Sequence, residues 1–175
     1  MVSPRIVVIG PPGAGKTTVG RLLADRLSVG FRDVDHDIAV AAGKSISDIF
    51  TSDGEPVFRE LEENAVATGL AEHDGVLALG GGAILSARTR ERLAEHVVLF
   101  LNVGMTAGVQ RTGLSTARPL LSGVNPRATF KALLDARLPL YREVARIEVQ
   151  TDDLGPEQVV DEAVRGLAEL EQARA

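Results

Sequence analysis

The segment that most constrains the fold is the glycine-rich run Gly10–Thr17, whose sequence is GPPGAGKT. It follows the apolar run Ile6–Ile9, and the apolar residues after it recur at helical spacing. A strand, a turn and a helix therefore surround the full G-x-x-x-x-G-K-[ST] pattern of a phosphate-binding loop. Its glycines let backbone N–H groups point at phosphate oxygens, and the helix N-terminus adds positive potential. The run predicts a nucleoside triphosphate site; a glycine-rich turn without a ligand is the alternative.

Individual loop residues have predicted tasks. Lys16 can reach the β- and γ-phosphates, and the Thr17 hydroxyl can ligate Mg²⁺. The loop residues expected to contact the nucleotide are Gly13, Ala14, Gly15, Lys16, Thr17 and Thr18.

Length and composition limit the other possibilities. A chain of 175 residues suffices for one α/β domain and is too short for two of ordinary size. The net charge of −5 and the 3% aromatic content argue against nucleic acid or an anionic membrane as a partner. There is no cysteine, and the three histidines are too scattered for a metal site. We expect a cytoplasmic monomer, because the chain shows no membrane-length apolar run, no signal-peptide layout and no heptads.

Strands and helices alternate along the chain. Predicted strands cover residues 6–9, 31–35, 76–79, 97–101 and 147–151. Predicted helices cover residues 15–27, 36–42, 46–50, 55–72, 86–95, 106–111, 127–137, 139–144 and 156–172. Apolar strands separated by helices indicate a parallel sheet covered on both faces. We therefore expect one domain over residues 1–175, a three-layer α/β P-loop fold with a central parallel five-stranded sheet.

One segment, residues 112–125, has little apolar periodicity and would be hard to bury. It is the natural candidate for a mobile lid. Arg118 lies within it, and an arginine that swings over the phosphates on lid closure is a recurring device in phosphoryl transfer.

Two carboxylates, Asp33 and Asp35, stand two residues apart at the end of the second predicted strand, so they should share a face. Ligands of open α/β sheets bind outside the carboxyl ends of the strands, which places the pair beside the phosphate loop. The two can hold Mg²⁺ through water and orient or deprotonate an acceptor hydroxyl. The alternative is that Asp35 merely caps a helix that begins at His36.

Two further features are candidates for a functional role, and one arginine has no assignment from the sequence pattern alone. Arg59 and Glu62 share one face of the 55–72 helix, although an exposed ion pair contributing at most ~1 kcal/mol is an alternative. The triple glycine 80–82 follows a strand and permits an N–H nest that approaches a ligand closely. The direction of Arg137, just before Pro139, depends on tertiary structure.

Taken together, these motifs resemble the shikimate kinases, a family of P-loop kinases related to nucleoside-monophosphate kinases. The likeness covers nearly the whole chain. Its specific part is the run from Ser45 through Glu62 together with the triple glycine, because phosphate loops occur in many unrelated activities. The segments that carry it are GPPGAGKTTVGRLLADRL, FRDVDHDI, SISDIF, GEPVFRELE, LALGGGAI, RPLL and ARLPLYREVA.

The resemblance implies ATP-dependent phosphorylation of the 3-hydroxyl of shikimate, a step of aromatic amino-acid biosynthesis. It implies that Thr17 and Asp33 are associated with Mg²⁺, and that the catalytic residues are Asp35, Lys16 and Arg118. The implied shikimate site, formed partly by a helical segment over residues 36–62, consists of Asp35, Phe50, Phe58, Arg59, Glu62, Gly80, Gly81, Gly82 and Arg137. Two of these, Arg59 and Arg137, would bind the substrate carboxylate. The implied nucleotide contacts beyond the loop are Arg111, Arg118 and Pro156.

The chain departs from the family pattern in two places. Similar proteins often carry a basic residue that stacks on adenine, whereas the segment Thr151–Pro156 has none. Adenine is then expected to rest on Arg111 and the Pro156 loop. The lid also lacks a second arginine close before Arg118. Neither departure touches the acceptor site.

Other functions fit parts of this pattern. A gluconate kinase of the same fold is the nearest alternative, and a nucleoside-monophosphate kinase is a weaker one. A nucleotide-dependent switch or an inactive paralogue would also keep the loop. The guanine-specific N-K-x-D sequence is absent, and the residues that an inactive paralogue would lose are all present: Lys16, Asp33, Asp35 and Arg118. The pattern therefore favours an enzyme.

Overall fold

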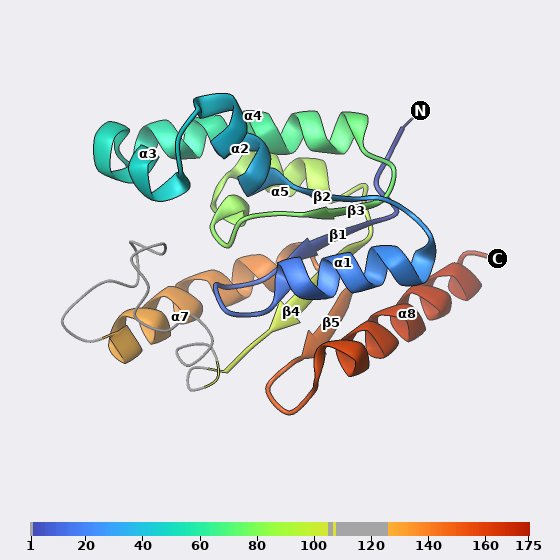
Figure 1. The fold of residues 1–175 in the computed structure, drawn as a ribbon. Coiled ribbons are helices and arrows are strands. Elements are labelled where there is room, and N and C mark those ends of the chain that lie inside the picture. The colour runs from blue at the N-terminus through green and yellow to red at the C-terminus, as the bar shows by residue number, and fades with distance from the viewer. Residues whose placement is uncertain (1, 105–106, 108–125) are drawn as a thin grey trace.

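The computed structural model describes residues 2–104, 107 and 126–175 (Figure 1). Five parallel strands form one sheet in the order β2-β3-β1-β4-β5. They are β1 (Ile6–Ile9), β2 (Phe31–Asp33), β3 (Val76–Ala78), β4 (Val98–Asn102) and β5 (Ile147–Gln150). The helices are α1 (Lys16–Leu27), α2 (Val34–Ala42), α3 (Ile46–Asp53), α4 (Glu55–Glu72), the 3₁₀ helix η1 (Ala83–Leu85), α5 (Ala87–Leu93), α7 (Pro126–Val144) and α8 (Pro156–Ala173).

Both faces of the sheet are buried, as the apolar strands predict. Successive side chains of a strand point to opposite faces. Along β1, Ile6 and Val8 enter a core shared with α1 and α8, whereas Val7 and Ile9 enter a core shared with α2, α3 and α4. Figure 1 shows helices on both sides of the sheet. The predicted three-layer α/β fold is confirmed.

The register of the central strands places the site. Val8 of β1 pairs with Ala78 of β3, and Ala78 pairs with Asp33 of β2. The carboxyl ends of these three strands therefore lie side by side at one edge of the sheet. The phosphate loop, the triple glycine and the start of α2 all leave the sheet from this edge.

The second strand is shorter than predicted, because α2 begins at Val34. Asp33 is its N-cap and accepts a hydrogen bond at Oδ1 from the Asp35 backbone N–H at 2.9 Å. This capping hydrogen bond stabilises the helical conformation at a position where the alternating pattern predicted a strand. Asp35 therefore lies in the first helical turn.

The predicted break before Pro139 is wrong, since α7 is one helix that contains this proline. A proline inside a helix removes one hydrogen bond and costs about 3 kcal/mol. Buried side chains on both sides of it, Phe130 and Tyr141, fix the two halves against the core. Their packing outweighs the local cost.

Smaller differences concern element ends: α3 extends to Asp53, and η1 was not predicted. The predicted helix 106–111 falls almost wholly outside the described residues, as does the predicted lid 112–125. Among the described helices, none is long and apolar enough to cross a bilayer.

Candidate active site

The phosphate loop has the backbone geometry that its glycines predict. Gly13 and Gly15 have φ values of 83° and 85°, a left-handed conformation that strains other residues. Lys16 donates from Nζ to the carbonyl oxygens of Gly10 and Pro11 at 2.8 and 3.1 Å. These contacts hold the ammonium over the loop. The first turn of α1 has no side-chain cap, so its N–H groups suit phosphate oxygens.

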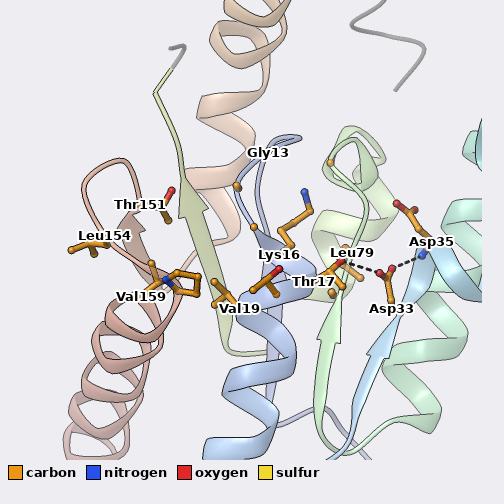
Figure 2. Close-up of a pocket in the computed structure, with 16 residues that line it drawn as sticks. Gly13, Lys16, Thr17, Val19, Asp33, Asp35, Leu79, Thr151, Leu154 and Val159 are labelled. Carbon is orange, nitrogen blue, oxygen red and sulfur yellow. Dashed lines mark hydrogen bonds between the residues drawn. The ribbon is translucent and has the colours of Figure 1, made fainter. Parts of the chain in front are cut away.

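A pocket of about 430 Å³ opens beside this loop (Figure 2). The predicted nucleotide-binding residues that line it are Gly13, Ala14, Gly15, Lys16, Thr17, Thr18 and Pro156. Asp33, Asp35 and Gly81, predicted for the metal and the acceptor, line the same pocket. Two of the predicted acceptor residues, Asp35 and Gly81, thus share a cavity with the phosphate loop, whereas Arg59 and Glu62 line a different cavity.

The two acidic residues hold different places in this pocket. The Thr17 hydroxyl donates to Asp33 Oδ2 at 3.3 Å, so a hydroxyl and a carboxylate oxygen face each other beside the phosphate loop (Figure 2). Asp35 lies beyond them, toward the triple glycine. The alternative, in which Asp35 only caps a helix, is wrong, because the N-cap of α2 is Asp33.

The opposite end of the pocket is largely apolar. Leu154 and Val159 line it beside Pro156, and Thr151 adds a hydroxyl that donates to the Asn102 carbonyl at 3.0 Å. Leu154 stands in the segment where similar proteins often have a basic residue. These apolar side chains suit a base better than a charged group. Arg111, predicted to share this role, lies outside the described residues.

The carboxylate of Glu62 is buried and the guanidinium of Arg59 is half-buried, so the exposed-pair alternative is wrong. Arg59 donates from Nη1 to Glu62 at 2.8 Å, and their side chains are 21% and 4% exposed. Burial raises the pKa of Glu62 above its usual value, against the opposing effect of the Arg59 charge and hydrogen bond. The charges of Asp35 and Arg137 also act on Glu62, so these groups lie in one electrostatic neighbourhood.

Aromatic rings surround Arg59. Its guanidinium carbon lies 5.9 Å from the Phe50 ring centroid and 5.3 Å from that of Phe58. The two ring centroids are 4.7 Å apart. The rings thus form an apolar wall against the cation, as a cation–π arrangement requires.

The triple glycine provides space, not unusual dihedral angles. None of the three has a positive φ, so the expected N–H nest lacks its left-handed residue. A Cβ at Gly80 would lie 2.6 Å from Asp35 Oδ1 and 3.0 Å from Glu62 Oε2. A Cβ at Gly82 would overlap the Arg59 guanidinium. The glycines therefore let Asp35, Glu62 and Arg59 approach the backbone at one corner.

Arg137 is 6% exposed on α7 and reaches the same corner. It lies beside Tyr141, which was not among the site residues predicted from the sequence. The Tyr141 hydroxyl donates to the Gly81 carbonyl at 2.5 Å. Its signals in the sequence were that it is the single tyrosine and that it lies in the segment ARLPLYREVA. Arg118 lies outside the described residues.

The chain matches one protein family over most of its length. The family model described as shikimate kinase matches residues 12–168. Shikimate kinase of Saccharopolyspora erythraea is 69% identical over 163 residues, covering 93% of each chain. Shikimate kinase of Streptomyces avermitilis is 56% identical over 173 residues, covering 99% of this chain and all of that one.

Two solved structures have a similar fold. Shikimate kinase from Acinetobacter baumannii in complex with shikimate superposes with a TM-score of 0.92 at 37% identity, covering 97% of this chain and 94% of that one. A gluconokinase from Sinorhizobium meliloti shares the fold at a TM-score of 0.60 and 20% identity, with 98% and 95% coverage. Sequence and structure agree that this chain belongs to the shikimate kinase family.

Proposed function

We propose that the protein transfers the γ-phosphoryl group of ATP to the 3-hydroxyl of shikimate, and that it does so at the sheet edge described above. Its family membership supports this reaction, and the structural neighbour from Acinetobacter baumannii is a complex with shikimate. The observation that carries the proposal is the ion pair of the half-buried Arg59 with the buried Glu62, which lies near Asp35 at the glycine segment, while Asp35 lines the pocket of the phosphate loop. Arg59 can bind an anionic group of the acceptor at the same end of the sheet as the phosphate loop.

On the nucleotide side, residues 13–18 bind the triphosphate. The loop N–H groups and Lys16 neutralise phosphate charge, and neutralisation of the developing charge is the main catalytic task in phosphoryl transfer. The surface around Leu154 and Pro156 receives the base. Arg111 and Arg118 are proposed to contact the nucleotide from the segment before α7, and Arg118 to close over the transferring group with residues 112–125.

Mg²⁺ is proposed as the cofactor, held by the Thr17 hydroxyl and, through water, by Asp33. These oxygen donors match the preference of a hard cation. Within the described part of the chain no cluster of three or more acidic or histidine side chains could hold a metal alone. That agrees with a cation that takes its remaining ligands from water and substrate phosphates. When bound, Mg²⁺ neutralises charge on the β- and γ-oxygens.

On the acceptor side, Arg59 and Arg137 bind the shikimate carboxylate. A guanidinium offers paired planar donors that match a carboxylate better than an ammonium does. Glu62 keeps Arg59 in place, and Phe50 and Phe58 wall the site. The glycines 80–82 let the ring of the substrate lie close to the backbone.

Asp35 is proposed to accept a hydrogen bond from the 3-hydroxyl and to aim its oxygen at the γ-phosphorus. The hydroxyl proton passes to Asp35 as the new P–O bond forms, and ADP leaves with the electrons of the broken bond. Because transition states of this class are loose, alignment contributes more than early proton removal. We also propose that the enzyme works in the cytoplasm, where ATP is available, and that it is a monomer.

Product analysis tests this function. The purified protein, ATP, Mg²⁺ and shikimate are incubated together, and the product is examined by phosphorus and proton NMR. We expect one phosphate monoester whose phosphorus couples to the proton on C3. An ester at another hydroxyl, or no ester, would contradict the proposal.

A further inference from the structure

Tyr141 is fully buried in α7 at the edge of the acceptor site. Its ring stacks on Phe100 of β4, with ring centroids 4.8 Å apart and an interplanar angle of 19°. The stacking alone would be served by phenylalanine. A hydroxyl inside a core has a desolvation cost unless it is hydrogen-bonded, so its partners show what the oxygen does.

Both partners belong to the acceptor site. The hydroxyl donates to the Gly81 carbonyl at 2.5 Å. Arg137, one helical turn earlier on the same face of α7, lies beside the hydroxyl, and its charge and hydrogen bonding act on the pKa of Tyr141. The hydroxyl therefore lies between the Arg137 guanidinium and a backbone carbonyl. It joins an arginine on α7 to the glycine segment after β3.

The hydroxyl keeps its proton under physiological conditions. Burial raises the pKa of Tyr141 to about 12, and the Arg137 charge and hydrogen bond act in the opposite direction. The proton therefore remains available to Gly81, and an oxygen lone pair remains available to Arg137.

A second link joins the same two parts of the chain without touching Arg137. Arg90 of α5 donates to the Ile84 carbonyl at 2.8 Å and pairs with Glu143 of α7 at 2.9 Å. The contacts of Arg90 thus hold α7 against the segment after β3 independently of Tyr141. Tyr141 differs because its hydroxyl lies beside the guanidinium of Arg137 itself.

We propose that Tyr141 is a positioning residue of the acceptor site, whose hydroxyl fixes the Arg137 guanidinium relative to the glycine segment so that Arg137 and Arg59 receive the same carboxylate. This proposal rests on the proposed shikimate kinase function. An arginine side chain loses considerable rotamer freedom when it is held in one place. A fixed partner at its tip means that this loss occurs on folding and not on substrate binding.

The direct test is Tyr141→Phe, which keeps the ring and removes the oxygen. We expect the KM for shikimate to rise roughly tenfold, since hydrogen bonds to charged groups are among the stronger ones. The kcat and the KM for ATP should stay within about twofold. Glu143→Gln is the matched control: it breaks the other link to α7 and should leave the shikimate KM unchanged.

A substrate analogue separates positioning from general loosening. With the carboxamide of shikimate in place of the acid, the ratio of KM between Tyr141→Phe and wild type should fall toward one, because the anionic partner of Arg137 is gone. A ratio that stays tenfold would overturn the proposal. So would a loss confined to kcat and thermal stability. A wild-type protein that phosphorylates no shikimate would instead contradict the proposed function itself.

The single tyrosine of the chain allows a second measurement that needs no substitution. Protein grown with 3-fluorotyrosine carries one ¹⁹F label, at Tyr141. Saturating shikimate should shift this resonance, because the bound carboxylate changes the electric field at the hydroxyl beside Arg137. Saturation with shikimate at an unchanged resonance would contradict the proposal, whatever the folding of the phenylalanine variant.

Discussion

The Arg59 guanidinium donates to the buried carboxylate of Glu62 at 2.8 Å, one helical turn along α4. On its other side, Nε and Nη2 donate to the half-exposed Glu55 at 3.3 Å. The shorter contact, to the buried Glu62, anchors Arg59. The longer contact involves the carboxylate of Glu55 near solvent, which we propose that the carboxylate of the substrate replaces. Arg59 is thus held by one acid while presenting two donors to an exchangeable one.

Arg59→Lys tests whether these paired donors recognise the substrate. An ammonium keeps the charge and loses the planar fork, so the anchor and the substrate cannot both be held in the same geometry. We expect the KM for shikimate to rise roughly 10- to 100-fold with little change in the KM for ATP. Steady-state kinetics with each substrate varied in turn measures both.

The matched control for that variant is Arg165→Lys. Arg165 pairs with Glu162 at the same 2.8 Å, but on an exposed surface of α8. Its kinetics should equal those of the wild type. Equal losses for both substrates in Arg59→Lys would indicate a folding defect and would contradict a carboxylate-binding role.

Gly82→Ala tests the space requirement of the glycine segment. The φ of Gly82 is −102°, which alanine adopts without strain, so the only problem is the new Cβ against the Arg59 guanidinium. Overpacking of this kind costs about 1–3 kcal/mol. We expect a corresponding rise in the shikimate KM and an unchanged affinity for ATP, measured by calorimetric titration.

Gly30→Ala is the control for this change, because a Cβ there would meet only His73 at 3.6 Å, an ordinary contact. It should bind both substrates normally. Normal binding of shikimate by Gly82→Ala would contradict the proposal that Arg59 binds shikimate from its position beside Gly82.

Asp35→Asn tests the catalytic carboxylate. Loss of a general base lowers rates by roughly 10²–10⁴-fold. We expect a fall of that size in kcat with retained ATP binding, measured by ADP release and by titration. Asp37→Asn is the neighbouring control, since Asp37 lies in the same helical turn but faces Arg32 at 2.6 Å. Near-normal turnover in Asp35→Asn would exclude the role.

The titration of Glu62 should change activity and the free energy of unfolding in opposite directions. Burial raises its pKa above the ordinary 4.5, so the folded state binds this proton more tightly than the unfolded state does. Its contribution to the free energy of unfolding is therefore most favourable at acid pH and is lost as the pH rises through the folded pKa. Activity moves the other way, because protonation removes the anion that anchors Arg59.

The expected observation is an acid limb in kcat/KM for shikimate, centred above pH 4.5. Glu62→Gln should lower kcat/KM at neutral pH and remove this limb, because glutamine does not titrate. Rate profiles of both proteins across the acidic range provide the measurement. An unchanged limb in the variant would assign it to another group.

Much of the fold could be predicted because its strongest patterns are local. The phosphate loop combines spacing, glycine conformation and a helix start in eight residues, and α4 has the predicted bounds of Glu55–Glu72. The start of α2 was missed because strand alternation and capping compete at Asp33. Local pattern cannot decide between them, since the outcome depends on how the strand end packs.

The missed parts of the site depend on contacts distant in sequence. Tyr141 and Gly81 are 60 residues apart, and neither lies in a motif that points to the other. Likewise, the continuous α7 depends on burial around Pro139, which a local pattern does not contain. The sequence identified the glycine segment but not why it must be glycine. These glycines leave room for Arg59 and Asp35, which come close only when the helices that carry them are packed.

We propose that an ATP site and a site for a hydroxylated carboxylate, shikimate, lie together at the carboxyl end of the sheet. A coupled assay of ADP release with ATP and Mg²⁺ tests it most directly, run with shikimate, gluconate, a nucleoside monophosphate and no acceptor. We expect release that depends on shikimate alone. Release with gluconate or a nucleotide instead would contradict the assignment of Arg59 and Arg137, and release without an acceptor would contradict the kinase account as a whole.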